Sequence, residues 1–234
     1  MGGWWWRVTV RGNESAVEFV RVTPRRGALV LSVPGRIVRR FEGVLKVTRE
    51  SALTATITMP LETAVASVVA AESSPGAALE ALKAQAVAAR SYYSGGSRHS
   101  GGSDFCDTTH CQFLRQPPDV GSLPAQAAAA TRHLVLTFDG KILQALYSAS
   151  CGGRTKSLRE AGMREQPYSY YAVQCTRCRE KKSSGHGIGM CQEGASGLAA
   201  RGVSFEQILN RYYPGARVQS VGFGPSHRTT PQKP

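Results

Sequence analysis

The sequence contains no run of about 18 consecutive apolar residues, so it offers no candidate for a membrane-spanning helix. Its start, MGGWWWRVTVRG, also lacks the basic stretch and the apolar core of a signal peptide. Either the natural leader or gene start differs from this sequence, or the protein stays in the cytoplasm. Nucleotide-binding loops of the GxxxxGK[ST] and GxGxxG types are missing as well, which argues against a nucleotide-binding enzyme.

Acidic residues are scarce, since 16 Asp and Glu stand against 29 Lys and Arg, for a formal net charge of +13 and a pI near 9.9. The expected partners are therefore anionic: nucleic acid, acidic lipid, or a cell-wall polymer that carries carboxylates and phosphates. A zinc-containing nucleic-acid binder is one candidate function. It is weakened because no expected helix concentrates Arg and Lys and the aromatic residues are not interleaved with basic ones.

The 234 residues, of which 41% are hydrophobic, can bury a sizeable core. Residues 4–58 alternate short β-prone runs with turn signals, which predicts an antiparallel meander or small barrel of four to six strands. Helical patterns follow, so we expect an α+β fold. Its predicted parts are a β-rich segment at 1–58, the core of the domain at 59–223 and a disordered tail at 224–234.

Residues 61–93 are predicted to form two helices around a Ser-Ser-Pro break, because apolar residues recur at helical spacing on both sides of it. Ser74 is expected to cap the second helix, and the proline after it to open that helix. At about 100° per residue, Glu72 lies within about 20° of the direction of Leu61, on the apolar stripe of the first helix. Arg90 falls on the apolar stripe of the second helix. Charged groups on buried faces are costly and require a reason.

The later part of the chain gives clear local signals. Residues 125–133 are predicted to be a short helix, and two strands flank the Asp139-Gly140 pair, which is a common hairpin turn. Residues 192–200 and 204–213 are also predicted to be helical, with Ser204 as the cap of the second.

Cysteine and histidine form two sets with metal-ligand character. The first set, His99, Cys106, His110 and Cys111, has the soft ligand types that zinc prefers. The alternative is a Cys106–Cys111 disulfide with two surface histidines. A second set has the order of a zinc site with three cysteines and one histidine: Cys175, Cys178, His186 and Cys191. For this set a disulfide or free thiols are preferred over a second zinc, because the spacing departs from that of a zinc knuckle.

Several separate motifs occur in the order of a known family. They are the Glu72-Ser-Ser-Pro segment, LKAQAVAAR, CDTTHCQ, YSASCGGRT, and HGIGMCQEGASGLAARG followed by QILNRYYPGA. Together they resemble the stage II sporulation protein D / LytB amidase-enhancer family over about residues 41–218. The sequence departs from the family by lacking the long insertion that usually precedes the GHGxGM segment, and by Cys191, where a serine is frequent.

The resemblance implies an activity and a site. Sporulation protein D members are lytic transglycosylases that cut peptidoglycan glycan strands already stripped of peptides, and the glutamate before the LKAQA helix, here Glu72, is the catalytic acid. The resemblance also implies a location in the cell envelope, a glycan cleft between two lobes lined by Arg90, and a role for Tyr92 or Tyr93. Some members carry zinc near this cleft. By resemblance the ligands here are His99, Cys106 and Cys111, with His110 as a fourth candidate.

The residues themselves support an acid role for Glu72. An apolar stripe and a helix C-terminus both disfavour the carboxylate and raise its pKa. In a lytic reaction the 6-hydroxyl of the sugar attacks the anomeric carbon, so one residue can protonate the leaving oxygen and then accept the hydroxyl proton. A hydrolase would need a second carboxylate. The alternative is an ion pair between Glu72 and Arg90, which would lower the pKa of Glu72.

Polar side chains near two glycine-rich segments are expected to hydrogen-bond sugar hydroxyl and N-acetyl groups, and glycine allows close approach of the backbone to a sugar. These candidate residues are Ser148, Ser150, Gly153, Thr155, His186 and Gln192. The competing function is a noncatalytic cell-wall-binding module that enhances a separate amidase. The presence of Glu72 at the expected position favours the enzyme.

Overall fold

The structure is a computed structural model that describes residues 6–10, 13–17, 19–25, 27–33, 35, 37–49, 53–100, 103–179 and 182–222. The helices are α1 (Leu61–Glu72), α2 (Leu79–Ser94), α3 (Leu123–Ala130), α4 (Gln192–Ala199) and α5 (Phe205–Tyr212), with a short 3₁₀ helix η1 (Thr176–Cys178). The strands are β1 (Trp6–Val10), β2 (Asn13–Val17), β3 (Phe19–Val22), β4 (Leu29–Val33), β5 (Ile37–Phe41), β6 (Val44–Arg49), β7 (Leu53–Thr58), β8 (Leu134–Phe138), β9 (Lys141–Ile142), β10 (Tyr147–Ser148), β11 (Met190–Cys191) and β12 (Arg217–Ser220).

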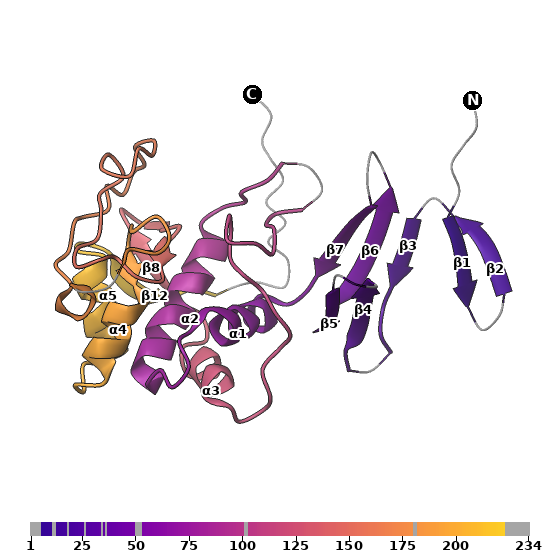
Figure 1. Cartoon of the computed structure of the whole chain (residues 1–234), viewed down its shortest axis with the longest axis horizontal. Coiled ribbons are helices and arrows are strands. Elements are labelled where there is room, and N and C mark those ends of the chain that lie inside the picture. The colour runs from indigo at the N-terminus through magenta and orange to yellow at the C-terminus, as the bar shows by residue number, and fades with distance from the viewer. Residues whose placement is uncertain are drawn as a thin grey trace.

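Helix α2 lies at the centre of the helical part, where it contacts α1, α3, α4, α5 and β8 (Figure 1). Its middle consists largely of alanine, and Ala84, Ala86, Ala88 and Ala89 have no exposed surface. A helix that is buried on all sides needs small side chains wherever its neighbours approach closely. The LKAQAVAAR segment is therefore the axis around which the other helices pack.

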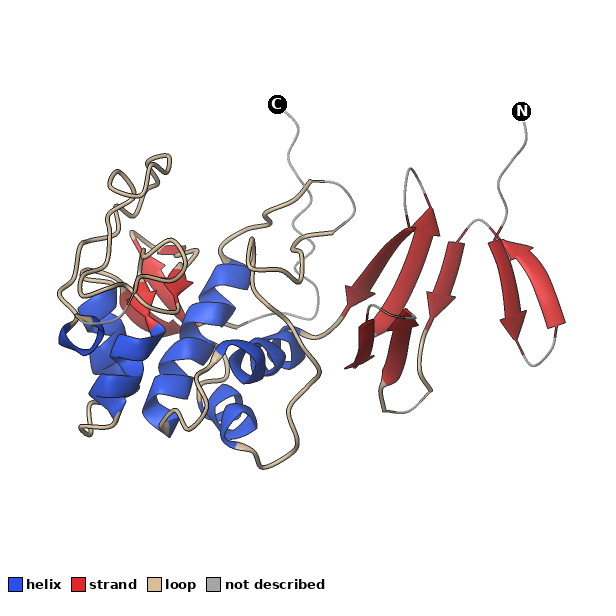
Figure 2. Cartoon of the chain, in the orientation of Figure 1, coloured by secondary structure: helices blue, strands red, loops and turns tan. Residues whose placement is uncertain are grey.

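The strands before α1 lie apart from the helices (Figure 2). They form three separate antiparallel sheets, β1–β2, β4–β5 and β3–β6–β7. The α+β class is confirmed, but the closed barrel is wrong, and seven strands precede α1 in the described residues where four to six were predicted. A simple meander is wrong too, because β3 pairs with β6 across the β4–β5 hairpin. Apolar contacts of Phe41, Ala64, Val68, Ala89 and Leu114 join this part to α1 and α2.

The two helices predicted within 61–93 are confirmed, and Glu72 is the last residue of α1. The predicted start of the second helix is wrong, since α2 begins at Leu79 without a side-chain cap. Ser74 and Pro75 instead begin a turn in which the N–H of Ala77 donates to the carbonyl of Ser74, with Gly76 at a φ of +75°. A Pro-Gly pair at the centre of a turn favours this geometry, which a helix cannot include.

The later local signals are confirmed. Strands β8 and β9 pair around Asp139 and Gly140, both of which have positive φ, as the tight hairpin turn requires. Helix α5 begins with a capping box, in which Ser204 and Gln207 satisfy each other's backbone N–H groups. The parallel pair β10–β11 brings the YSASCGG segment beside the GMCQ segment.

No helix within the described residues is long and apolar enough to cross a membrane. The predicted disordered tail at 224–234 lies outside the described residues. The division at residues 58 and 223 stays a prediction, as does the cleft between two lobes.

Candidate active site

Glu72 ends α1 with its side chain half-buried, where two groups from distant segments contact the carboxyl. The backbone N–H of Phe113 donates to Oε1, and the hydroxyl of Tyr147 lies within hydrogen-bonding distance. The backbone carbonyl of Glu72 accepts from Nε2 of Gln192 at 3.1 Å, which satisfies one of the free carbonyls at the helix end. The end of α1 is thus held by residues from β10, α4 and the segment before α3.

The hydroxyl of Tyr147 is oriented by Gln112. Nε2 of Gln112 donates to the carbonyl of Ala89 at 3.3 Å, which fixes the amide so that its Oε1 faces Tyr147. The Tyr147 hydroxyl donates to that Oε1 at 2.6 Å. The single proton of Tyr147 is therefore shared between two acceptors, Oε1 of Gln112 and the carboxyl of Glu72. Gln112 competes with Glu72 for this proton.

The electrostatics of the site agree with a protonated Glu72. Burial raises the pKa of Glu72 above its usual value of 4.5, while contacts with Tyr147 and Phe113 oppose this effect without cancelling it. Burial also raises the pKa of Tyr147, and the neighbouring Glu72 raises it further. A carboxyl group with a raised pKa can act as an acid nearer to neutral pH.

Arg90 does not contact Glu72. Its side chain has no exposed surface and forms a two-pronged ion pair with Glu62, with Nε to Oε1 at 2.9 Å and Nη2 to Oε2 at 2.7 Å. The remaining N–H groups donate to the carbonyls of Ala86, Ala128 and Leu134. The alternative of an ion pair between Glu72 and Arg90 is wrong, and burial with full pairing favours a core role for Arg90 over glycan contact.

The two tyrosines at the end of α2 differ in position. Tyr92 is buried and hydrogen-bonds the Cys111 sulfur, while Tyr93 is half-buried and stacks edge-on against Phe105, with ring centroids 4.8 Å apart. Burial raises the pKa of both, and for Tyr93 the second cause is the charge of Glu72. Of the two, Tyr93 is the one placed beside the acid.

The four side chains of the first metal set come together. Their ligand atoms all lie within 4.8 Å of one another. The Sγ of Cys111 is 3.3 Å from that of Cys106, 3.4 Å from Nε2 of His99 and 3.6 Å from Nδ1 of His110. A tetrahedral zinc ion with bonds of about 2.0–2.3 Å to nitrogen and sulfur needs separations of this size. The donor set therefore fits zinc, and all four residues are candidate ligands.

This candidate metal set is coupled to Glu72 through one short segment. Cys106, His110 and Cys111 directly precede Gln112 and Phe113, which orient Tyr147 and donate to the Glu72 carboxyl. A metal that fixed the cysteines would also fix these two residues. Residues 106–113 link metal binding to the geometry of the acid.

The predicted sugar-binding residues with hydroxyl side chains differ in whether their hydroxyls are hydrogen-bonded within the fold. Ser148 and Ser150 are buried, and neither hydroxyl has a hydrogen-bond partner within the described residues. Thr155 is wholly buried, where its hydroxyl donates to the carbonyl of Tyr171 and accepts from the N–H of Val173. The hydroxyl of Thr155 is thus engaged in the fold, while those of the two serines are buried and unpartnered within the described residues.

The GHGIGM segment contains one exposed side chain and one glycine in close contact with another segment. His186 is exposed, and its Nδ1 accepts from the N–H of Ile188 at 3.0 Å. Gly189 has a φ of +70°, and a Cβ there would lie 1.8 Å from the carbonyl oxygen of Leu146. Glycine at 189 therefore allows close approach of another protein segment. Gly153 likewise faces the backbone of Arg179, at ordinary contact distance.

A shallow pocket, open to solvent, lies beside the end of α1 between the α1–α2 loop, α2 and α4. Its polar lining includes Ser73, Gln85 and Gln192. Nε2 of Gln192 donates to Oε1 of Gln85 at 3.2 Å as well as to the Glu72 carbonyl. Gln192 therefore joins this pocket to the acid.

The second set of cysteines differs in one member from the grouping considered in the sequence. Cys175, Cys178 and Cys191 are joined by Cys151, and His186 does not belong to the group. Cys151 lies 24 residues before Cys175 in the sequence, so the sequence did not group it with the other three. The β10–β11 pairing brings its segment to Cys191.

Four residues important to the site were not predicted: Glu62, Gln112, Phe113 and Tyr147. A buried arginine requires an acidic partner, and this was a signal for Glu62, since residues 61–93 hold only three acids. Gln112 stands within the CDTTHCQ motif and Tyr147 within YSASCGGRT. The N–H of Phe113 has no sequence signal, because any residue except proline supplies one.

The comparisons with known proteins concern the same region. Residues 49–138 match the model of the SpoIID family, described as Stage II sporulation protein. An uncharacterized protein of Brachyspira hyodysenteriae is 25% identical over 243 residues, an alignment that covers 68% of this chain and 66%, just under two thirds, of that protein. The matched region contains Glu72, α2 and the first metal set. The chain is therefore similar to the SpoIID family over residues 49–138.

Proposed function

We propose that the protein is a peptidoglycan lytic transglycosylase that cleaves glycan strands, above all strands stripped of their peptides, with Glu72 as general acid and base. The similarity of residues 49–138 to the SpoIID family suggests a role in the cell wall or in sporulation. The observation that supports the specific activity is the environment of Glu72. Its carboxyl is desolvated and faces a tyrosine whose proton is shared with Gln112.

The proposed reaction needs one carboxyl group. Protonated Glu72 donates its proton to the glycosidic oxygen as the bond from that oxygen to the anomeric carbon breaks. The 6-hydroxyl of the same sugar then attacks the anomeric carbon and gives its proton to the Glu72 carboxylate, which restores the acid. The products are a 1,6-anhydro sugar end and a free hydroxyl end. The observed partners of the Glu72 carboxyl are a backbone N–H and a hydroxyl, and no second carboxyl is among them.

Gln112 acts as a positioning residue in this scheme. It competes with Glu72 for the Tyr147 proton, so that the tyrosine stabilises the carboxylate less than it would without Gln112. Release of that proton toward Glu72 would lower the pKa of the acid and weaken it.

The first metal set has a supporting role in the proposal. His99, Cys106, His110 and Cys111 would hold a zinc ion, which would stabilise the segment that leads to Gln112 and Phe113. Burial opposes the Cys106 thiolate, but hydrogen bonds from Thr108, His99, Cys111 and His110 together lower the pKa of Cys106 to about 5. A thiolate at this position suits metal binding.

The surroundings of Phe113 suit an anionic cell-wall polymer. The guanidinium groups of Arg39 and Arg115 lie 5.6 and 4.9 Å from its ring centroid, and Arg39 also pairs with Asp107. Positive charge near the acid would attract wall polymers that carry carboxylates and phosphates. The proposed partners are peptidoglycan glycan strands and a cell-wall amidase that strips them, and the proposed location is the cell envelope.

The test is mass spectrometry of purified peptide-free glycan strands after incubation with the protein. Wild type should release fragments with anhydro ends, and Glu72→Gln should release none. Glu206→Gln, at an exposed position in α5, is the matched control and should act like wild type. Binding to wall material without release of anhydro fragments would overturn the enzymatic proposal in favour of an amidase-enhancing module.

A further inference from the structure

The four cysteines of the second cluster come from separate parts of the chain. Cys151 follows β10, Cys175 and Cys178 border η1, and Cys191 ends β11 and caps α4. All four are buried, with at most 5% of their surface exposed. Their sulfur atoms lie within 4.8 Å of one another, so the fold brings four sulfurs to one point.

The spacing of the sulfurs suits a single metal ion with tetrahedral geometry. The Sγ of Cys178 lies 3.6 Å from that of Cys175 and 3.4 Å from that of Cys191. Four Zn–S bonds of about 2.3 Å in a tetrahedron place the sulfurs about 3.8 Å apart. A disulfide requires about 2.05 Å, and all four thiols are free here. In a polynuclear iron–sulfur centre the cysteines bind different irons and lie further apart.

The surroundings of the sulfurs supply donors for thiolates. The N–H of Gly194, in the first turn of α4, donates to Cys191 at 3.4 Å, and the hydroxyl of Tyr212 donates to Cys175 at 3.6 Å. The N–H of Gly153 donates to Cys151. Such hydrogen bonds orient and stabilise the ligands of protein metal centres.

Close packing at the cluster requires glycine at position 194. A Cβ on Gly194 would lie 1.9 Å from the hydroxyl oxygen of Tyr212 and 2.6 Å from the sulfur of Cys175. The side chain of any other residue would therefore displace both a ligand and its donor.

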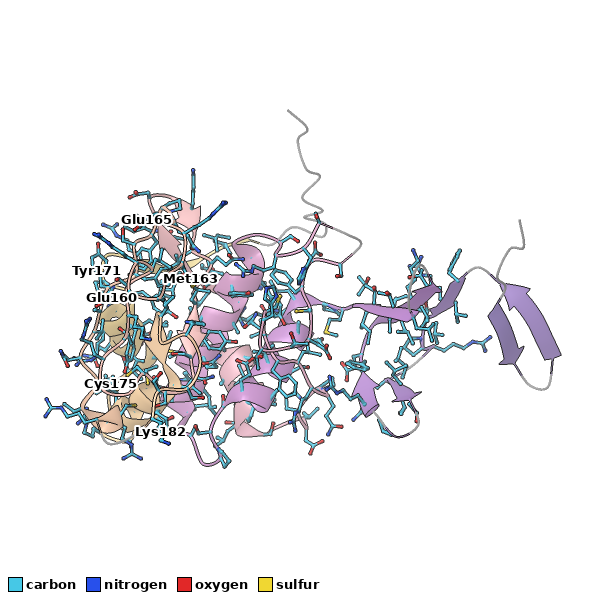
Figure 3. All side chains as sticks on the ribbon, turned by 45° about the horizontal axis from the view of Figure 1, so that its top comes forward. Glu160, Met163, Glu165, Tyr171, Cys175 and Lys182 are labelled. Carbon is cyan, nitrogen blue, oxygen red and sulfur yellow. The ribbon has the colours of Figure 1, made fainter. Side chains whose placement is uncertain are left out.

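The segment between Cys151 and Cys191 has little regular secondary structure, so a metal centre would stabilise it. Apart from η1, isolated bridges and turns, its described residues form no helix or strand until β11. In Figure 3, Glu165, Tyr171, Cys175 and Lys182 mark its course along one end of the molecule. Long irregular segments need a constraint of another kind. A metal bound at both ends and in the middle would provide it.

We propose that Cys151, Cys175, Cys178 and Cys191 form a closed tetrahedral zinc site that is separate from the first metal set and holds residues 151–191 in place. The four protein ligands leave no open position for substrate, so this centre is structural. It fixes the β10–β11 pair, and both Tyr147 in β10 and Gln192 directly after β11 contact Glu72. This inference does not depend on glycan cleavage.

Native mass spectrometry of the full chain, prepared with reductant and zinc, tests the proposal. Wild type should carry two zinc ions, one for each group of ligands. Cys106→Ser/Cys111→Ser and Cys151→Ser/Cys178→Ser should each carry one. The proposal would be overturned if wild type carried a single zinc ion and Cys151→Ser/Cys178→Ser kept it. That result would place the only bound zinc outside the second cluster.

Cobalt identifies the ligands with the second cluster intact. Cys106→Ser/Cys111→Ser loaded with Co²⁺ should show the intense sulfur-to-cobalt bands of a tetrahedral site with four thiolates. Weak bands of an octahedral ion would contradict it. Peptide mapping of the unreduced wild-type protein provides an independent measurement: free thiols that become alkylated only after chelation support the zinc site, whereas a disulfide between any two of the four cysteines would overturn it.

Discussion

Replacement of Glu62 by alanine tests the buried ion pair that joins α1 to α2 and α3. Arg90 has no exposed surface, and two of its five hydrogen bonds go to the Glu62 carboxylate. Without that carboxylate the guanidinium would remain buried with its charge unpaired. The expected result is a large loss of folding stability with no direct change to the acid.

The magnitude follows from two estimates that agree. Breaking a buried ion pair by removal of one partner costs about 3–5 kcal/mol. Two lost hydrogen bonds to a charged group, at about 1.5–3 kcal/mol each, give a similar range. The Glu62 side chain is 26% exposed, so water can reach part of the vacated site. We therefore expect Glu62→Ala to lower the free energy of unfolding by about 3 kcal/mol, at the lower end of the range.

Urea unfolding followed by far-UV circular dichroism measures this change, at a fixed zinc concentration because bound metal shifts stability. Arg154→Gln is the matched control, since Arg154 forms an exposed pair with Glu160 and such pairs contribute little. Glu62→Leu/Arg90→Met should recover part of the loss, because an apolar pair needs no charge compensation. An unfolding free energy of Glu62→Ala equal to that of Arg154→Gln would refute the reasoning.

Three further predictions concern the acid and its support. Gln112→Leu frees the Tyr147 proton to donate to Glu72, so the pKa of Glu72 should fall. The basic limb of the pH–activity profile should then shift to lower pH, and an unshifted limb would exclude this role of Gln112. Glu72→Gln should raise the free energy of unfolding at neutral pH, because a raised pKa means that ionisation of Glu72 destabilises the folded state. This gain should vanish below the ordinary pKa of 4.5, so urea unfolding at neutral pH and below pH 4.5 checks the sign. Gly189→Ala should lower the free energy of unfolding by at least about 2 kcal/mol, because Gly189 has a positive φ and a Cβ there would clash with a carbonyl oxygen. Gly202→Ala, with positive φ in open space, should lower it less, and equal losses of unfolding free energy would show that the clash is relieved.

Local patterns in the sequence predicted the helices and the position of Glu72 well. Periodicity identified both helices of 61–93, and the short-range signals at Asp139-Gly140 and Ser204 needed no tertiary information. The error at Ser74 was also local, because a cap followed by proline and a turn containing Pro-Gly share the same residues. Gly76 decides between them, since its positive φ ends any helix.

Partners that are distant in sequence were less predictable. The apolar stripe of α2 shows that Arg90 is buried, but it does not show that Glu62, rather than Glu72, faces it from the neighbouring helix. Cys151 joins the second cluster only because two short strands pair in parallel, a contact with no local signature. The order of strands β3 and β6 depends on a hairpin inserted between them. Each of these is a tertiary contact that the pattern of a single segment does not specify.

The central claim is that Glu72 cleaves a glycan strand alone, without attack by water. Digestion of peptide-free strands in water enriched in the heavy oxygen isotope tests it most directly. Wild type should yield anhydro ends that carry no label, and Glu72→Gln should yield no fragments. Fragments with labelled reducing ends from wild type, or anhydro fragments from Glu72→Gln at the wild-type rate, would contradict it.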